Sequence, residues 1–197
     1  MEINHLILTI IIVVYFFTHS FFLHPPVKKY FTQKLFFSFR AYRIVFNIFA
    51  ILGLVVIYGV SNQINDKLWI DSGLLRAIGF IVIISGINIT YKSFKNYNIK
   101  EFIGITAEST DTLQNNLVVD GFHNNVRHPV YLATIIIFAG NFLYSPNYSN
   151  LILLVLTTIY LQIGIYLEEK KLQAKFGESY IKYKQRVPKL LPRKFGI

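Results

Sequence analysis

Long apolar runs alternate with polar segments along the 197-residue chain. A helix rises about 1.5 Å per residue, so about 20 apolar residues cross a hydrocarbon core of about 30 Å. The pattern predicts an all-α, polytopic integral membrane protein with about five transmembrane helices. We expect these helices at about Ile3–Leu23, Ile44–Val60, Leu74–Tyr91, Val130–Tyr144 and Leu151–Leu167.

The fourth and fifth runs are joined by a short turn of turn-forming residues at 145–147. They therefore predict a helical hairpin, whose two open ends lie at the same face of the membrane. Beyond the hairpin, apolar side chains recur three or four residues apart, which predicts an amphipathic tail along the membrane interface. These side chains are Leu172, Phe176, Tyr180, Tyr183 and Val187.

The same pattern predicts one membrane domain over residues 1–197. The first run ends at His24-Pro25-Pro26 without a small-residue cleavage motif, so we expect a retained anchor and not a signal peptide. In the third run, Gly79 and Gly86 are seven residues apart, which favours close helix packing over a cofactor role. The expected parts are three N-terminal spans in 1–91, a cytoplasmic loop in 92–129, the hairpin in 130–167 and a cytoplasmic tail in 168–197.

Composition supports a membrane protein without a separate soluble catalytic domain. Apolar residues make up 53% of the chain and charged residues only 15%, against about 25% in globular proteins. The chain has no cysteine, which excludes disulfides, thiolate nucleophiles and cysteine-based metal sites. Any active site must therefore be built from helix ends and short loops.

The positive charge is distributed as membrane topology requires. The net charge is +10, and 18 of the 20 basic residues fall in the segments that five spans place on one side. The positive-inside rule then puts the N-terminus outside and the loop and tail in the cytoplasm. This distribution argues against nucleic acid as a partner. We expect a bacterial plasma membrane, and an endoplasmic reticulum membrane is the alternative that fits the same topology.

Ionisable residues stand at both open ends of the predicted hairpin. Arg127 and His128 precede the fourth run, and Glu168 and Glu169 directly follow the fifth. Charges at the edge of a membrane are costly without a partner or a function. Acidic residues at a helix C-terminus also oppose the helix dipole. Their negative charge therefore predicts either a basic side chain that compensates it or a positively charged ligand that binds there. Lys170-Lys171 is the alternative, purely local partner.

These residues belong to a longer pattern. The chain reads G-x-x-x-x-x-R-H-P-x-Y from Gly121, and then E-E-x-x-L-x-x-x-F-G-x-x-Y-x-x-Y-x-x-R-V-P from Glu168. Over Leu117–Pro192 this resembles the isoprenylcysteine carboxyl methyltransferase family, which is related to the phospholipid methyltransferases of membranes. The resemblance implies a membrane-embedded methyltransferase.

The resemblance also implies a cofactor, S-adenosyl-L-methionine, with S-adenosyl-L-homocysteine as its product and no metal. The catalytic candidates are Arg127, His128, Glu168 and Glu169. His123 stands where the family has an aromatic residue, and a histidine ring can still stack on adenine. The implied cofactor-binding positions are Asn115, Asn116, Leu117, Val118, His123, His128, Pro129, Val130, Tyr131 and Glu168.

The methyl acceptor is less defined. The prenylcysteine enzymes place an arginine for the substrate carboxylate one turn before the first glutamate, and this chain has Gly164 there. We therefore expect a lipid-like or small hydrophobic acceptor, with a prenylcysteine-type carboxylate as one option. Two alternatives stay open, namely an NADPH-dependent membrane reductase of the sterol-reductase type and a non-enzymatic lipid-binding scaffold.

Overall fold

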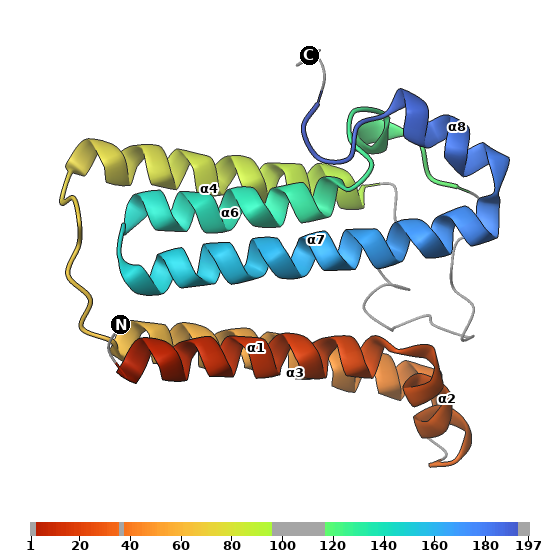
Figure 1. Ribbon diagram of the computed structural model, residues 1–197, viewed down its shortest axis with the longest axis horizontal. Helices are drawn as coiled ribbons and strands as arrows, with labels where there is room; N and C mark the ends of the chain where they lie inside the picture. The colour runs from red at the N-terminus through yellow and green to blue at the C-terminus, as the bar shows by residue number, and fades with distance from the viewer. Residues whose placement is uncertain (1–2, 36–37, 96–116, 193–197) are drawn as a thin grey trace. The chain divides into compact units, whose positions relative to one another are not determined.

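The computed structural model describes residues 3–35, 38–95 and 117–192, and this part of the chain is helical without strands. The all-α, polytopic architecture is confirmed (Figure 1). The helices are α1 (Ile3–Leu23), α2 (Pro25–Gln33), α3 (Phe39–Gln63), α4 (Gly73–Phe94), the 3-10 helix η1 (Gly121–Asn124), α6 (Pro129–Tyr144), α7 (Tyr148–Phe176) and α8 (Glu178–Arg186).

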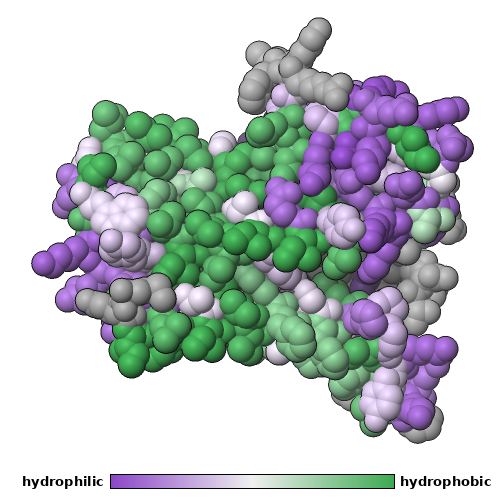
Figure 2. Space-filling model, viewed as in Figure 1, coloured by the Kyte–Doolittle hydropathy of each residue, from purple (hydrophilic) through white to green (hydrophobic). Residues whose placement is uncertain are grey.

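Four helices of the described chain, α1, α3, α4 and α7, are long and apolar enough to cross a membrane. The fourth expected span, α6, is apolar but has 16 residues, or about 24 Å of helix. Large apolar side chains such as Ile51, Phe80 and Ile159 are exposed on these helices, and Figure 2 shows apolar surface over much of this face. Exposed apolar surface of this extent indicates contact with lipid.

Two helix boundaries differ from the prediction. The segment expected as a basic linker after the first span forms α2, because Pro25 and Pro26 sit in the first turn of a new helix, where a missing N–H is harmless. The fifth span does not end at Leu167, because good helix formers continue α7 to Phe176. Glu168 and Glu169 therefore lie inside a helix, and the prediction that they oppose its C-terminal dipole was wrong.

The chain forms two compact units, one up to Asp66 and one from Lys67 onward among the described residues. In the first unit, the hydroxyl of Tyr15 on α1 donates to the carbonyl of Ala50 on α3 at 3.0 Å. Nε2 of His5 is hydrogen-bonded to a carboxylate oxygen of Asp66 at 2.7 Å, and their side chains are 6% and 7% exposed. These contacts join α1 to α3 and to the segment that follows α3, and the single membrane domain expected over 1–197 stays a prediction.

In the second unit, α4 and α6 run antiparallel and in close contact (Figure 1). A Cβ atom added to Gly79 would lie 2.7 Å from the carbonyl oxygen of Gly140 and would overlap the backbone of Tyr144. A Cβ atom added to Gly86 would lie 2.6 Å from Ile137. The expected packing role of Gly79 and Gly86 is thus confirmed, since both glycines let two helix backbones approach closely.

The predicted hairpin is formed by α6 and α7. Asn147 caps α7 by accepting from the backbone N–H of Asn150 at 2.8 Å. The side chain of Asn150 donates to the carbonyl of Ser145 at 2.7 Å and accepts from Asn141 at 2.8 Å. These bonds fix the turn, so α7 runs back alongside α6 and extends past the level at which α6 begins (Figure 1).

The tail is helical but is not one continuous helix. Gly177 has a φ of 52°, a conformation that glycine adopts readily, and the chain turns there between α7 and α8. The apolar tail residues consequently pack together against the segment before η1. This cluster consists of Tyr180, Tyr183 and Val187 with Leu117, Val119, Leu172 and Phe176.

The glycine contacts lead to a first prediction. Gly79→Ala should lower the free energy of unfolding by about 1–3 kcal/mol, because the new methyl group meets backbone atoms that cannot move aside. Gly59→Ala in α3 is the matched control, since an added Cβ there meets nothing within 4 Å. The control should leave stability unchanged or raise it by up to about 1 kcal/mol. Unfolding of detergent-solubilised protein measures both, and equal effects would contradict the packing role.

Candidate active site

The loop before α6 is held by the segment that follows α8. The backbone N–H of Arg127 donates to the carbonyl of Pro188 at 2.9 Å, and that of His128 donates to Lys189 at 3.2 Å. Pro129 is buried and begins α6, where its missing N–H leaves no donor unpaired. Arg127 and His128 are therefore fixed between the start of α6 and the end of the tail.

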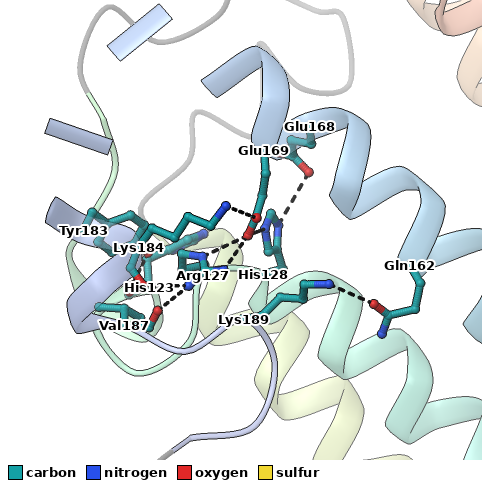
Figure 3. A network of polar contacts seen from close by, with 10 residues as sticks. All are labelled: His123, Arg127, His128, Gln162, Glu168, Glu169, Tyr183, Lys184, Val187 and Lys189. Atoms are coloured by element: carbon teal, nitrogen blue, oxygen red, sulfur yellow. Dashed lines mark hydrogen bonds and ion pairs between the residues drawn. The ribbon is translucent and has the colours of Figure 1, made fainter. Parts of the chain in front are cut away.

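Arg127 makes the central contact of this region. Its Nε and Nη2 atoms donate to the same carboxylate oxygen of Glu169, at 2.9 and 2.6 Å. Its Nη1 atom donates to the carbonyls of Lys184, at 3.1 Å, and of Val187 (Figure 3). The side chains of Arg127 and Glu169 are 7% and 10% exposed. Arg127 is thus the cation that compensates the charge of Glu169.

His128 lies between the two glutamates (Figure 3). Its Nε2 atom is 3.3 Å from Oε1 of Glu169, and its Nδ1 atom is 3.6 Å from Oε2 of Glu168. Only 3% of its side chain is exposed. Lys184 approaches the other oxygen of Glu169 at 3.3 Å. Both oxygens of the Glu169 carboxylate are therefore contacted by other side chains of the protein.

Glu168 differs sharply from its neighbour. Its side chain is 43% exposed, against 10% for Glu169. Its Oε2 atom is buried and lies 3.6 Å from Nδ1 of His128. Glu168 is thus oriented by His128 and still accessible, which is the combination that a ligand-binding carboxylate requires.

Aromatic and imidazole rings surround this carboxylate. The ring of Tyr131 lies edge-on to that of His128, with 5.5 Å between the ring centres. The backbone carbonyl of His123, in η1, accepts from the hydroxyl of Tyr183 at 2.6 Å. Burial, and next the charge of His128, lower the pKa of the His123 imidazole, while Glu168 opposes this shift. His123 therefore favours its neutral form.

The structure brings together most of the residues that the sequence indicated. Arg127, His128, Glu168 and Glu169 form one contact network. Leu117 packs against the apolar cluster of the tail, and the next residue, Val118, is half-buried. Asn115 and Asn116 lie outside the described residues. The expected binding role of all these positions stays a prediction.

Three tail residues were missed by the sequence interpretation. Lys184 contacts Glu169, Tyr183 holds η1, and the ammonium group of Lys189 donates to Oε1 of Gln162 at 3.2 Å. The positions next to Gly164 on its own helix, 162–166, contain no basic residue. The structure brings Lys189 to this helix from the tail. Lys189 stands directly after the R-V-P motif, and this position was the feature of the sequence that could have indicated it.

The buried ion pair leads to a second prediction. Glu169→Gln should lower the free energy of unfolding by about 3 kcal/mol, because the charge of Arg127 would remain buried without its counter-ion. Lys184→Gln is the control, since Lys184 contacts the same carboxylate but is 45% exposed, and it should cost at most about 1 kcal/mol. Unfolding in detergent compares them, and equal losses would contradict the central role of Arg127.

The pKa of His123 leads to a third prediction. Because its folded-state pKa lies below the ordinary 6.5, the unfolded chain binds a proton that the folded chain does not. Stability should therefore fall as the pH drops below about 6.5 and rise again with increasing pH. His123→Phe should remove this part of the pH dependence while keeping a flat ring. Unfolding curves between about pH 5 and 8 test this, and parallel curves for both proteins would contradict it.

Comparison with known proteins adds an independent observation. The sequence profile of the family described as phospholipid methyltransferase matches residues 74–179, which is more than half of the chain. The match begins in α4 and extends into α8, so it contains Arg127, His128 and both glutamates. No solved structure matches this chain.

Curated relatives carry more specific names. Over 180 residues, 88% of this chain, it is 28% identical to methanethiol S-methyltransferase 1 of Bradyrhizobium diazoefficiens. Over 158 residues, 76% of this chain, it is 25% identical to methanethiol S-methyltransferase of Crocosphaera subtropica. The matches cover 62% and 60% of these relatives, so the chain spans less than two thirds of their length.

The profile covers the helices that carry the network, and the chain has the apolar helices of a membrane protein. A methyltransferase family also agrees with the resemblance in the R-H-P and paired-glutamate motifs, and it favours that interpretation over the reductase and scaffold alternatives. The chain belongs to the phospholipid methyltransferase family of membrane proteins.

Proposed function

We propose that this protein transfers a methyl group from S-adenosyl-L-methionine to a small thiol, with the methyl donor held at Glu168. The observation that carries this proposal is the contrast between two adjacent carboxylates. Glu169 is sealed by Arg127, while Glu168 is 43% exposed and oriented by His128. An oriented, accessible carboxylate in a membrane methyltransferase suits a positively charged ligand.

The residues around Glu168 fit the chemistry of this donor. S-adenosyl-L-methionine carries a positive sulfonium and an ammonium group, both of which a carboxylate attracts, and its ribose hydroxyls can donate to carboxylate oxygens. His123 and Tyr131 offer flat rings for the adenine base. When bound, the donor supplies a methyl group that its positive sulfur makes electrophilic.

The protein's own groups would hold and prepare the reactants. A thiol reacts as its thiolate, so its proton must be accepted before or during methyl transfer. Both ring nitrogens of His128 face carboxylates, Nδ1 at 3.6 Å from Glu168 and Nε2 at 3.3 Å from Glu169, so we assign His128 to orienting Glu168, and the proton of the thiol passes to water. Arg127 and Glu169 are positioning residues, since Arg127 holds the carboxylate of Glu169, whose Oε1 atom lies 3.3 Å from Nε2 of His128.

The acceptor is inferred from the curated relatives, whose names specify methanethiol. A small thiol also agrees with Gly164, because no arginine for a substrate carboxylate stands on that turn of α7. The phospholipid in the family's description supports a second candidate, a lipid-like acceptor. By the positive-inside rule, the site faces the cytoplasm and the N-terminus lies outside, as in a bacterial plasma membrane protein.

The proposal makes a fourth prediction. S-adenosyl-L-homocysteine at about 100 times its dissociation constant should stabilise the detergent-purified protein by about 2.7 kcal/mol. Glu168→Gln should weaken its binding about tenfold or more, and Glu168→Lys should abolish it, because a charge-assisted bond is lost or reversed. Glu178→Lys is the matched control, as Glu178 is an exposed acid on α8. Calorimetry of the four proteins measures this.

Binding to Glu168→Lys as tight as to the wild type would overturn the assignment of the donor site. Transfer of labelled methyl groups to methanethiol, with phosphatidylethanolamine in parallel, then tests the acceptor separately. Methylation of the lipid alone would support the second candidate. Stabilisation by NADPH and not by S-adenosyl-L-homocysteine would overturn the methyl donor itself.

A further inference from the structure

The first unit contains a pocket that the proposed reaction does not use. It lies between α1 and α3 near the start of α2 and has a volume of about 650 Å³, within the usual range of about 300–1,000 Å³ for ligand pockets. All its described lining residues belong to this unit. We infer that it binds one anionic phospholipid of the surrounding bilayer.

One face of α3 sets the polarity of this pocket. Arg43, Asn47 and Ile51 line it at intervals of four residues, so they lie along one face of the helix. Each step advances about 6 Å into the span. The lining therefore changes from a cation through a neutral hydrogen-bonding group to a hydrocarbon side chain over about 12 Å.

The positive charge is gathered at the outer end of the pocket. The ammonium group of Lys28, on α2, lies 4.1 Å from the ring centre of Phe39, and the guanidinium carbon of Arg43 lies 5.7 Å from the same ring. Lys28 and Arg43 both line the pocket, and none of its described lining residues is acidic. Two cations beside one ring at a membrane edge are suited to a phosphate group.

The wall contributed by α1 adds one polar side chain below its apolar end. Leu23, at the end of α1, and His19, one turn deeper, line the pocket with Phe22. A second pocket of about 160 Å³, lined entirely by aromatic residues and Val45, shares Phe22 with the first. Polar groups thus lie between the charged end and the apolar depth, where the ester groups of a phospholipid lie in a bilayer, and the smaller pocket offers space for hydrocarbon.

The change of the lining from positively charged to apolar side chains indicates which kind of molecule the pocket binds. An inorganic phosphate would use only the cationic end, and a neutral hydrocarbon only the apolar depth. A phosphodiester with a net negative charge and acyl chains uses both ends at once. Phosphatidylglycerol has these groups, whereas phosphatidylcholine adds a cation that Lys28 and Arg43 would repel.

The chain offers a closely matched control for testing this site. Lys29 on α2 and Arg40 on α3 stand in the same two helices as Lys28 and Arg43, but neither lines the pocket. The variants Lys28→Gln/Arg43→Gln and Lys29→Gln/Arg40→Gln therefore remove equal charge from the same end of the unit. Their difference reports the pocket and not the general attraction between a basic surface and anionic lipid.

The experiment is a titration of the full-length protein in a neutral detergent with phosphatidylglycerol, read as thermal stability, with native mass spectrometry to count retained lipids. We expect one retained lipid and similar titration midpoints for the wild type and Lys29→Gln/Arg40→Gln. The midpoint for Lys28→Gln/Arg43→Gln should rise about tenfold or more, because two charged contacts are lost. Circular dichroism of each variant confirms that it is folded before it is compared.

Parallel titrations with phosphatidylcholine and with glycerol 3-phosphate distinguish the other occupants. Both should act far more weakly than phosphatidylglycerol. Equal stabilisation by phosphatidylcholine would overturn the role of charge, and equal stabilisation by glycerol 3-phosphate would overturn the role of the acyl chains. An identical titration for the pocket variant and its matched control would overturn the site.

Discussion

The buried ion pair between Arg127 and Glu169 is the contact on which the candidate active site depends. It joins the loop before α6 to α7, and through two backbone carbonyls it also holds α8 and the segment after it. Removing two charges from water is expensive, and such a pair is stabilising only when its remaining hydrogen-bonding groups are satisfied. Here His128, Lys184 and the two carbonyls provide those bonds.

This arrangement gives two identical neighbours different roles. Successive residues of a helix point about 100° apart, so Glu168 and Glu169 approach His128 from different directions, and Arg127 contacts Glu169. Glu169 turns toward Arg127 and becomes part of the framework, while Glu168 turns toward an accessible space beside His128. The framework fixes His128 at the first turn of α6, so the orientation of Glu168 depends on contacts made by its neighbour.

The rest of the molecule supports this site by simple means. The glycines of α4 and α6 let these two helices pack closely. This packing holds α6, the short helix that begins directly after His128. The apolar residues of the tail pack against Leu117 and Val119. This packing brings Val187 and Lys189 beside the loop that precedes α6. The N-terminal unit adds a pocket whose graded polarity matches an anionic lipid. The apolar helices thus provide the contact with the bilayer, and one charged network provides the proposed ligand site.

The sequence by itself determined the membrane class, the approximate spans and the hairpin, because apolar runs and turn formers act over a few residues. It also indicated Arg127, His128, Glu168 and Glu169 as one set. It did not show which glutamate is sealed, that α7 continues through both, or that Lys184 and Lys189 reach α7. Those outcomes depend on pairing between segments far apart in the chain, decided by the turn at Gly177 and by the need of one buried arginine for a counter-ion. Local patterns carry no information about such pairing, so only the tertiary structure decided it.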